Sequence, residues 1–135
     1  MTFTDITIVP VRTEQKPVYL EFSKRIAEIY REHGALRVAS CWQEDDASED
    51  ADFHAADAMA NYEPGSLPNF RKLAGAGEGE TVIVSFIEWP SREARDLGVK
   101  AVAVDPRIQA TVNEEPVFDG GRLIAGGFTV ALDLG

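Results

Sequence analysis

The stretch VIVSFIEWPSREARD, residues 82–96, most constrains how this chain can fold, because a strand, a stop and a helix start follow one another there. The segment around it, residues 81–89, is the most apolar of the chain and places apolar side chains on both alternating sides. Pro90 ends this predicted strand, Ser91 is a good N-cap and Glu93 suits the positive first turn of a helix. The spacing predicts a strand followed at once by a helix that ends before Pro106.

Three further strands and one helix are predicted from the alternation and spacing of apolar residues. Pro17 suits a first helical turn, and Gly34 suits the position just after a helix. The Gly126 and Gly127 pair predicts a bulge in the last strand, or the close approach of another backbone. The predicted elements are strand 3–11, helix 17–33, strand 35–43, strand 81–89, helix 91–105 and strand 122–132.

Residues 44–80 form a long connection that differs in character from the rest of the chain. Acids crowd its first part without a base among them, and glycines and prolines follow. A short helix is predicted within it at residues 53–61. A connection of this length is unusual in a small domain, so we expect either a lid over a site or an insertion.

The order β-α-β-β-α-β predicts an α+β fold, a ferredoxin-like four-stranded antiparallel sheet with two helices on one face, as one domain over residues 1–135. A sheet with one face in water should alternate apolar and polar residues, but these strands are apolar on both sides. The two helices can cover only one face. We therefore expect a homodimer in which the second face packs against the same face of another copy.

The charge, the cysteine content and the apolar runs of the chain limit its expected partners and location. The chain has 23 acidic residues against 13 Lys and Arg, a formal net charge of -10, so nucleic acid and anionic lipid surfaces are unfavourable partners. A single cysteine, Cys41, excludes an internal disulfide framework. The first residues lack the basic start of a secretory signal, and no apolar run is long enough to span a bilayer. We expect a cytoplasmic protein with no membrane association.

Four segments of the chain, in order, are GALRVASCW (34–42), VIVSFIEWPSREARD (82–96), DPRI (105–108) and PVFDGGRLIAGGF (116–128). Together they resemble one known family, the YbaA-like proteins, domain-of-unknown-function family 1428. The resemblance implies membership of the dimeric α/β barrel superfamily and brings no established activity. The chain departs from the family in two places: its connection 44–80 is longer, with only Asp52 and Phe53 looking familiar, and Phe86 stands in place of an expected tryptophan.

Glu88 is the candidate catalytic residue, because a carboxylate at the end of an apolar strand could have a raised pKa and act as a general base. The alternative is an ion pair with Arg37 or Arg122. Arg37, Arg95 and Arg107 are candidates to bind a carboxylate or enolate ligand, since guanidinium groups do this well. Pairing with the abundant acids is the alternative for these arginines.

Trp42 and Trp89 could stack against a flat ligand, although core or interface packing is the alternative for both. His33 suits the end of the first helix better than a catalytic role. No metal site is predicted, because His54 and the acids near it fit no ligand motif, and Cys41 reads as an inert thiol.

Two classes of function remain open, since this fold class hosts many activities. The first is a cofactor-independent small-molecule enzyme, monooxygenase- or isomerase-like, that uses a cleft between sheet and helices with Glu88, Arg37 and Trp42 lining it. The second is a non-enzymatic ligand-binding or stress-related protein, in which the connection 44–80 acts as a lid or a partner contact. No cofactor is expected in either case.

Overall fold

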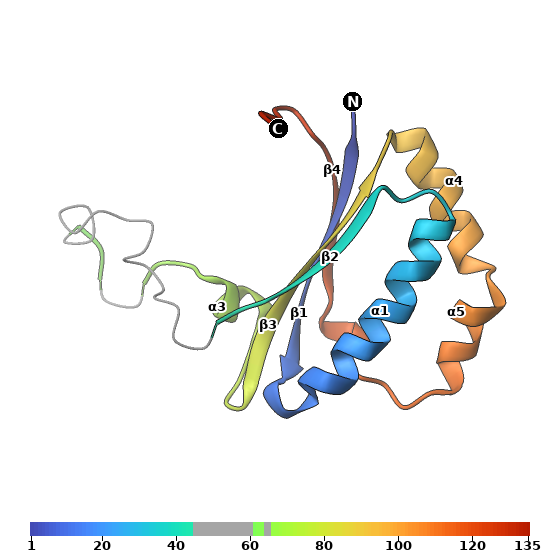
Figure 1. Ribbon diagram of the computed structural model, residues 1–135. Coiled ribbons are helices and arrows are strands. Elements are labelled where there is room, and N and C mark those ends of the chain that lie inside the picture. The colour runs from blue at the N-terminus through green and yellow to red at the C-terminus, as the bar shows by residue number, and fades with distance from the viewer. Residues whose placement is uncertain (45–60, 64–65) are drawn as a thin grey trace.

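The computed structural model describes residues 1–44, 61–63 and 66–135, and Figure 1 shows their arrangement. A twisted sheet lies in the middle, with α1, α4 and α5 on one side of it and α3 on the other. The elements are β1 (Phe3–Arg12), α1 (Lys16–Glu32), β2 (Arg37–Trp42), α3 (Phe70–Ala74), β3 (Glu80–Trp89), α4 (Arg92–Ala103), α5 (Pro106–Ala110) and β4 (Ile124–Thr129).

The sheet is antiparallel throughout, with strand order β2-β3-β1-β4. Sequential strands β1 and β2 are separated by β3, as the ferredoxin-like arrangement requires. β1 pairs with β3 along all of Phe3–Arg12, but with β4 only up to Ile8. The predicted α+β fold, with four antiparallel strands and the main helices on one face, is confirmed.

Some of the residues predicted to begin or end a helix do so in the structure. The Ser91 hydroxyl accepts a hydrogen bond from the Ala94 N–H at 3.1 Å, as expected for an N-cap. Gly34 follows α1 with a φ of 110°, a conformation that favours glycine. The predicted helix 91–105 is α4, which ends two residues early at Ala103, and α5, which begins at Pro106, was not predicted. Proline stops one helix and suits the first turn of the next, and the sequence analysis used only the first property.

The core under the helices consists of two clusters of buried side chains. Each apolar side chain that is fully buried contributes about 1.5–3 kcal/mol to the folded state. The first cluster contains Val9, Val11, Tyr19 and Ile83, and the second contains Phe3, Ala35 and Trp89. Trp42, Val117 and Phe118 pack against the first cluster, and Tyr30, Val38, Ile87 and Val99 against the second.

The opposite face of the sheet, here called the open face, is also apolar. Successive side chains of a strand point to opposite faces, so the residues that alternate with the core residues lie here. Phe128 is 53% exposed and Ile124 39% exposed. No helix among the described residues covers the middle of this face, and α3 packs mainly against β1 and β3. The apolar side chains of the open face are Ile6, Ile8, Ala39, Cys41, Val82, Val84, Phe86, Ile124 and Phe128.

The bulge predicted in the last strand is wrong. Gly127 pairs with Asp5 and Gly126 with Ile6, in an unbroken register. Close approach is the correct explanation for Gly127, but by a side chain: a Cβ there would lie 2.6 Å from the Phe3 ring. β4 is also shorter than predicted, because Gly120–Arg122 forms a turn of 3-10 helix before it.

In its described part, the connection 44–80 contains a helix, α3, that was not predicted from the sequence. Asn69 caps α3 by accepting a hydrogen bond from the Lys72 N–H at 2.9 Å. The many glycines and prolines around this segment hid the short helix, since they are typical of loops. The short helix predicted at residues 53–61 lies almost wholly outside the described residues.

Candidate functional site

Three hydroxyl groups lie side by side on the helix-covered face, in the centre of the sheet. Thr7 of β1 is opposite Ser85 of β3, which is opposite Ser40 of β2. The Oγ atoms of Ser40 and Ser85 are 3.0 Å apart and share a hydrogen bond. We call these three residues the hydroxyl row; it separates the two apolar clusters of the core.

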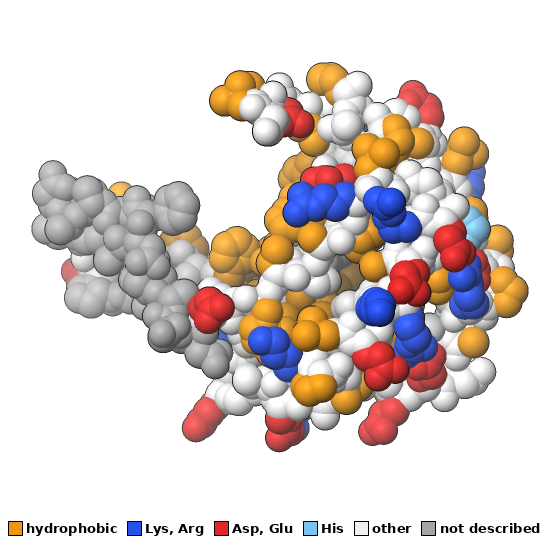
Figure 2. Space-filling view, viewed as in Figure 1, with side chains coloured by type: hydrophobic (Ala, Val, Ile, Leu, Met, Phe, Trp, Pro, Cys, Tyr) orange, Lys and Arg blue, Asp and Glu red, His pale blue; other side chains and the backbone are white. Residues whose placement is uncertain are grey.

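The hydroxyl row is accessible to solvent although it faces the helices. Val9 and Ile83 on one side of it, and Phe3 and Trp89 on the other, are buried, whereas none of the three hydroxyl residues is. The helices therefore stand away from the sheet at this level and leave a cleft. Figure 2 shows a hollow between the sheet and the helices, with hydrophobic side chains in its walls.

Asp5 lies next along β1 on the same face as the row, and its carboxylate is firmly held. It accepts hydrogen bonds from Trp89 Nε1 at 3.0 Å and from Arg95 Nε at 3.0 Å. The hydrogen bond to Asp5 raises the pKa of Arg95, so this guanidinium stays charged. Burial, followed by the nearby Asp5 carboxylate, raises the pKa of the Tyr30 phenol. The cleft thus has a fixed ion pair at one end.

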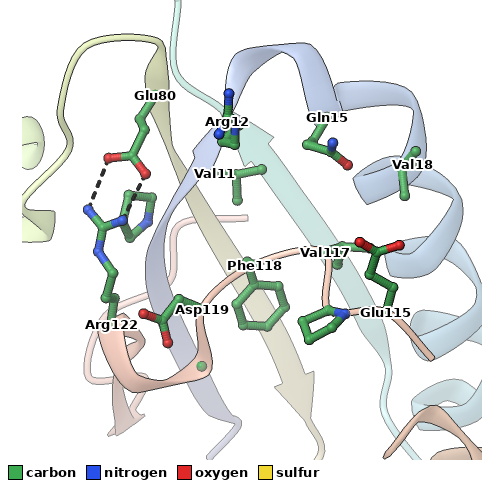
Figure 3. Close-up of a pocket in the computed structure, with 13 residues that line it drawn as sticks. Val11, Arg12, Gln15, Val18, Glu80, Glu115, Val117, Phe118, Asp119 and Arg122 are labelled. Atoms are coloured by element: carbon green, nitrogen blue, oxygen red, sulfur yellow. Dashed lines mark hydrogen bonds and ion pairs between the residues drawn. The ribbon is translucent and has the colours of Figure 1, made fainter. Parts of the chain in front are cut away.

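A second hollow, which we call the β1 groove, lies at the other end of the sheet and has a volume of about 880 Å³. Figure 3 shows Phe118 and Val11 at its centre, between an ion pair on one side and Gln15, Val18 and Glu115 on the other. The groove is lined by Pro10, Val11, Arg12, Gln15, Val18, Glu80, Glu115, Pro116, Val117, Phe118, Asp119, Gly120 and Arg122.

The ion pair in the wall of the β1 groove joins Arg122 and Glu80. Arg122 donates to both carboxylate oxygens of Glu80, at 2.7 and 3.0 Å, and also to the Gly75 carbonyl. Arg122, together with the Gly77 N–H, lowers the pKa of Glu80 from 4.5 to about 2. Glu80 therefore remains ionised at neutral pH. The pair joins the turn before β4 to the start of β3, and the bond to the Gly75 carbonyl joins that turn to the end of α3.

Aromatic rings connect the β1 groove to the core beneath the helices. The Phe118 ring lies edge-on to Tyr19 at 6.2 Å and to Phe22 at 6.4 Å, and Tyr19 lies 6.3 Å from Trp42. Edge-to-face arrangements at such distances are favourable for aromatic pairs. Phe118 also belongs to the segment 116–128 through which the chain resembles its family. No residue of that segment was predicted from the sequence to bind a ligand.

The two tryptophans proposed as ligand contacts both lie on the helix-covered face. Trp42 is partly buried beside Tyr19, with the Lys16 ammonium 5.1 Å from the centre of its ring. Trp89 is fully buried against Gly98, where an added Cβ would lie 2.3 Å from the indole ring. Trp42 can line the cleft, whereas Trp89 acts through its hydrogen bond to Asp5.

Glu88 and Arg37 are not brought together with Trp42. Both lie on the open face, as opposite residues of β3 and β2, with Arg37 Nη1 3.7 Å from Glu88 Oε1. The ion pair that the sequence left open as an alternative for Glu88 is therefore present. A role for Glu88 would have to be on the open face rather than in the cleft.

Arg107, another predicted ligand contact, belongs to a cluster at the ends of α1 and α4. Its Nη2 donates to Asp105 at 2.8 Å and also to Glu32, and His33 Nε2 lies 2.9 Å from Asp105. The hydrogen bond from Arg107 lowers the pKa of Asp105 far below its usual range. The cluster joins α5 to α1 and lies outside both hollows.

Asp5 and the three residues of the hydroxyl row were not predicted from the sequence as site residues, and a signal was available only for Asp5. A lone carboxylate inside an otherwise apolar strand was the available signal, because a buried charge needs partners. Among the described residues, no group of three or more His, Cys, Asp or Glu side chains could hold a metal ion. None of the described helices is both long and apolar enough to cross a bilayer.

Solved structures with this fold are distant in sequence. SnoaB, a cofactor-independent oxygenase from Streptomyces nogalater, is 13% identical, with a TM-score of 0.56, over 98% of this chain and 96% of its own. A dimeric ferredoxin-like protein from an uncultured marine organism is 8% identical, with a TM-score of 0.55, over 98% of both chains. These similarities support the ferredoxin-like fold and not a shared activity.

Sequence relatives give the family. The uncharacterized protein YbaA of Escherichia coli strain K12 is 33% identical over 133 residues, which cover 98% of this chain and 99% of that protein. The YbaA protein of Shigella flexneri matches to the same extent. The family described as "Protein of unknown function (DUF1428)" matches residues 2–120. The chain is therefore a member of the DUF1428 family.

Proposed function

We propose that this protein is a homodimer that binds a small molecule in the cleft of each protomer. The dimer is supported by the open face, where Phe128 and Ile124 remain exposed beside the apolar centre of the sheet. Exposed apolar patches of this kind are typical of interfaces. One solved structure with this fold is described as dimeric.

The single observation that carries the binding proposal is the accessible hydroxyl row. Solvent reaches these hydroxyl groups between two apolar clusters. Ser40 and Ser85 share one hydrogen bond, so each keeps further capacity to bond a polar atom of a ligand in place of water. Adjacent strands are about 4.8 Å apart, so the three side chains present donors and acceptors in a line. Apolar clusters lie on both sides of this line. The arrangement suits a small, flat, mainly apolar and uncharged molecule with oxygen atoms along one edge.

We propose as the finer function cofactor-independent chemistry on that molecule, monooxygenase- or isomerase-like. It is supported by the similarity in fold to a cofactor-independent oxygenase. Asp5 also supports it. This carboxylate lies beside the hydroxyl row, and hydrogen bonds from Trp89 and Arg95 fix its position. Non-enzymatic binding is the second candidate, because Asp5 already accepts hydrogen bonds from both of these residues.

Binding of 1-naphthol, followed by calorimetry, tests the proposed site. Ser85→Leu should fill the cleft and abolish binding, and Ser40→Ala should weaken binding about tenfold, which corresponds to the loss of roughly one hydrogen bond. Cys41→Ser is the matched control, because Cys41 is adjacent to Ser40 in β2 but faces the other side of the sheet. Equal affinity of Ser85→Leu and the wild type would contradict the proposed location.

Turnover is tested separately from binding. Asp5→Asn keeps the shape of the side chain and should retain 1-naphthol binding. If the protein is an enzyme of the proposed type, oxygen uptake or isomerisation of any substrate found for it should fall at least about 100-fold in this variant. Unchanged turnover would exclude a role of Asp5 in the chemistry, while leaving the binding site in place.

A further inference from the structure

The segment 130–135 that follows β4, here called the arm, leaves the sheet with its apolar side chains exposed. The Val130 N–H donates to the Thr2 carbonyl at 3.0 Å, and this is the last backbone hydrogen bond between the arm and the sheet in the described structure. Beyond it, Leu132 is 77% exposed and Leu134 is 91% exposed. Figure 1 shows the arm bending toward the side of the sheet away from α1 and α4.

The alternation of residues in β4 continues into the arm. Ile124 and Phe128 point to the open face, and the residues at even positions that follow are Val130, Leu132 and Leu134. The residues between them in the arm, Ala131, Asp133 and Gly135, are small or acidic. The arm is not a strand, but Figure 1 shows it bending toward the open-face side of the sheet, so its apolar residues lie past the edge of the protomer on that side.

The protomer has no described strand with which the arm could pair. β1 begins at Phe3, and Met1 before it is 88% exposed, so the neighbouring strand ends where the arm begins. Two exposed leucines so close together are unfavourable in water unless another surface covers them.

We propose that each arm packs Leu132 and Leu134 against a second copy of this chain, so that two arms embrace the dimer reciprocally. This inference rests on the proposed homodimer. A second copy is the favoured occupant because the arm bends toward the same side of the sheet as the open face, through which that dimer would form. The arm carries one charged side chain, Asp133, so it adds little repulsion between two chains that each carry a net charge of -10.

Sedimentation equilibrium over nanomolar to micromolar concentrations tests the arm. The double variant Leu132→Ser/Leu134→Ser should raise the dimer dissociation constant at least about 100-fold, since each buried leucine contributes tenfold or more. The matched control is Leu97→Ser/Val104→Ser, which alters two residues of similar exposure at α4, on the helix side. The control should leave the dissociation constant unchanged.

The possible results distinguish a failure of the proposed arm contact from a failure of the proposed homodimer. A wild-type chain that is monomeric at micromolar concentration overturns the homodimer and the arm together. A wild-type dimer whose arm variant has the same dissociation constant overturns the arm alone. Circular dichroism of the arm variant should match the wild type; loss of secondary structure would show that the leucines pack within their own protomer, which also overturns the proposal.

Discussion

The two faces of the sheet are both apolar, but they differ in how far their aromatic side chains are buried. Trp89 on the helix-covered face is fully buried and its indole N–H is bonded to Asp5, whereas Phe128 on the open face is 53% exposed. Hydrocarbon on the first face stabilises the protomer. Hydrocarbon on the second face is available to stabilise an assembly, so the same kind of strand serves two purposes.

The largest expected effect is on protomer stability, and it should follow a change on the helix-covered face but not a change on the open face. Trp89→Ala should lower the free energy of unfolding by about 3–5 kcal/mol, because it leaves a cavity and removes a partner of Asp5. Phe128→Ala should change protomer stability by less than about 1 kcal/mol and instead weaken dimerisation. Urea unfolding at two protein concentrations distinguishes the effects. Equal losses at both positions and both concentrations would remove the distinction between the faces.

A smaller effect should come from Gly98, which lies in α4 against the Trp89 ring. A Cβ at this position would lie 2.3 Å from that ring and 2.7 Å from the His33 carbonyl oxygen. Gly98→Ala should therefore destabilise the protein by about 1–3 kcal/mol, even though alanine favours helices. Leu97→Ala next to it is the exposed control and should stay within about 0.5 kcal/mol.

The smallest effect concerns pH and the Glu80–Arg122 pair, where the edge of the sheet meets the β1 groove. Arg122 lowers the pKa of Glu80 from 4.5 to about 2 in the folded protein. The stabilisation that the pair provides is therefore complete above about pH 4.5 and is lost as the pH falls toward 2. Between pH 5 and 3, the free energy of unfolding should fall less steeply in Glu80→Gln than in the wild type.

The control for that measurement is Glu78→Gln, an exposed substitution two residues away. Its pH profile should follow the wild type. Identical profiles for all three proteins would show that the pair contributes nothing to stability, which is common for ion pairs at the surface.

Most of the fold could be predicted from the sequence, because its signals are local. The N-cap at Ser91, the glycine at position 34 and the alternation in residues 81–89 each act over a few residues. Two predictions failed where one residue has two possible structural roles. Pro106 was predicted to end a helix, but it also begins the next one. Gly127 was predicted to mark a bulge or a nearby backbone, but it makes room for the Phe3 ring.

The candidate site could be predicted only in part. Trp42 was recognised as a possible ligand contact and lies on the cleft side. Asp5 was missed, since Trp89 and Arg95, the residues that hold it, are 84 and 90 positions away in the chain. Glu88 was selected for its apolar neighbours, but the sequence did not show that these neighbours belong to the face without helices.

The sequence by itself determined that four amphipathic or two-sided strands and two main helices form, that the chain is acidic, and which family it belongs to. Periodicity, caps and turn residues act between near neighbours, so they can be read without coordinates. The tertiary structure decided which face the helices cover, and that Thr7, Ser40 and Ser85 meet in one row while Glu88 faces away. Strand register sets these positions, and register depends on pairing between residues far apart in the chain.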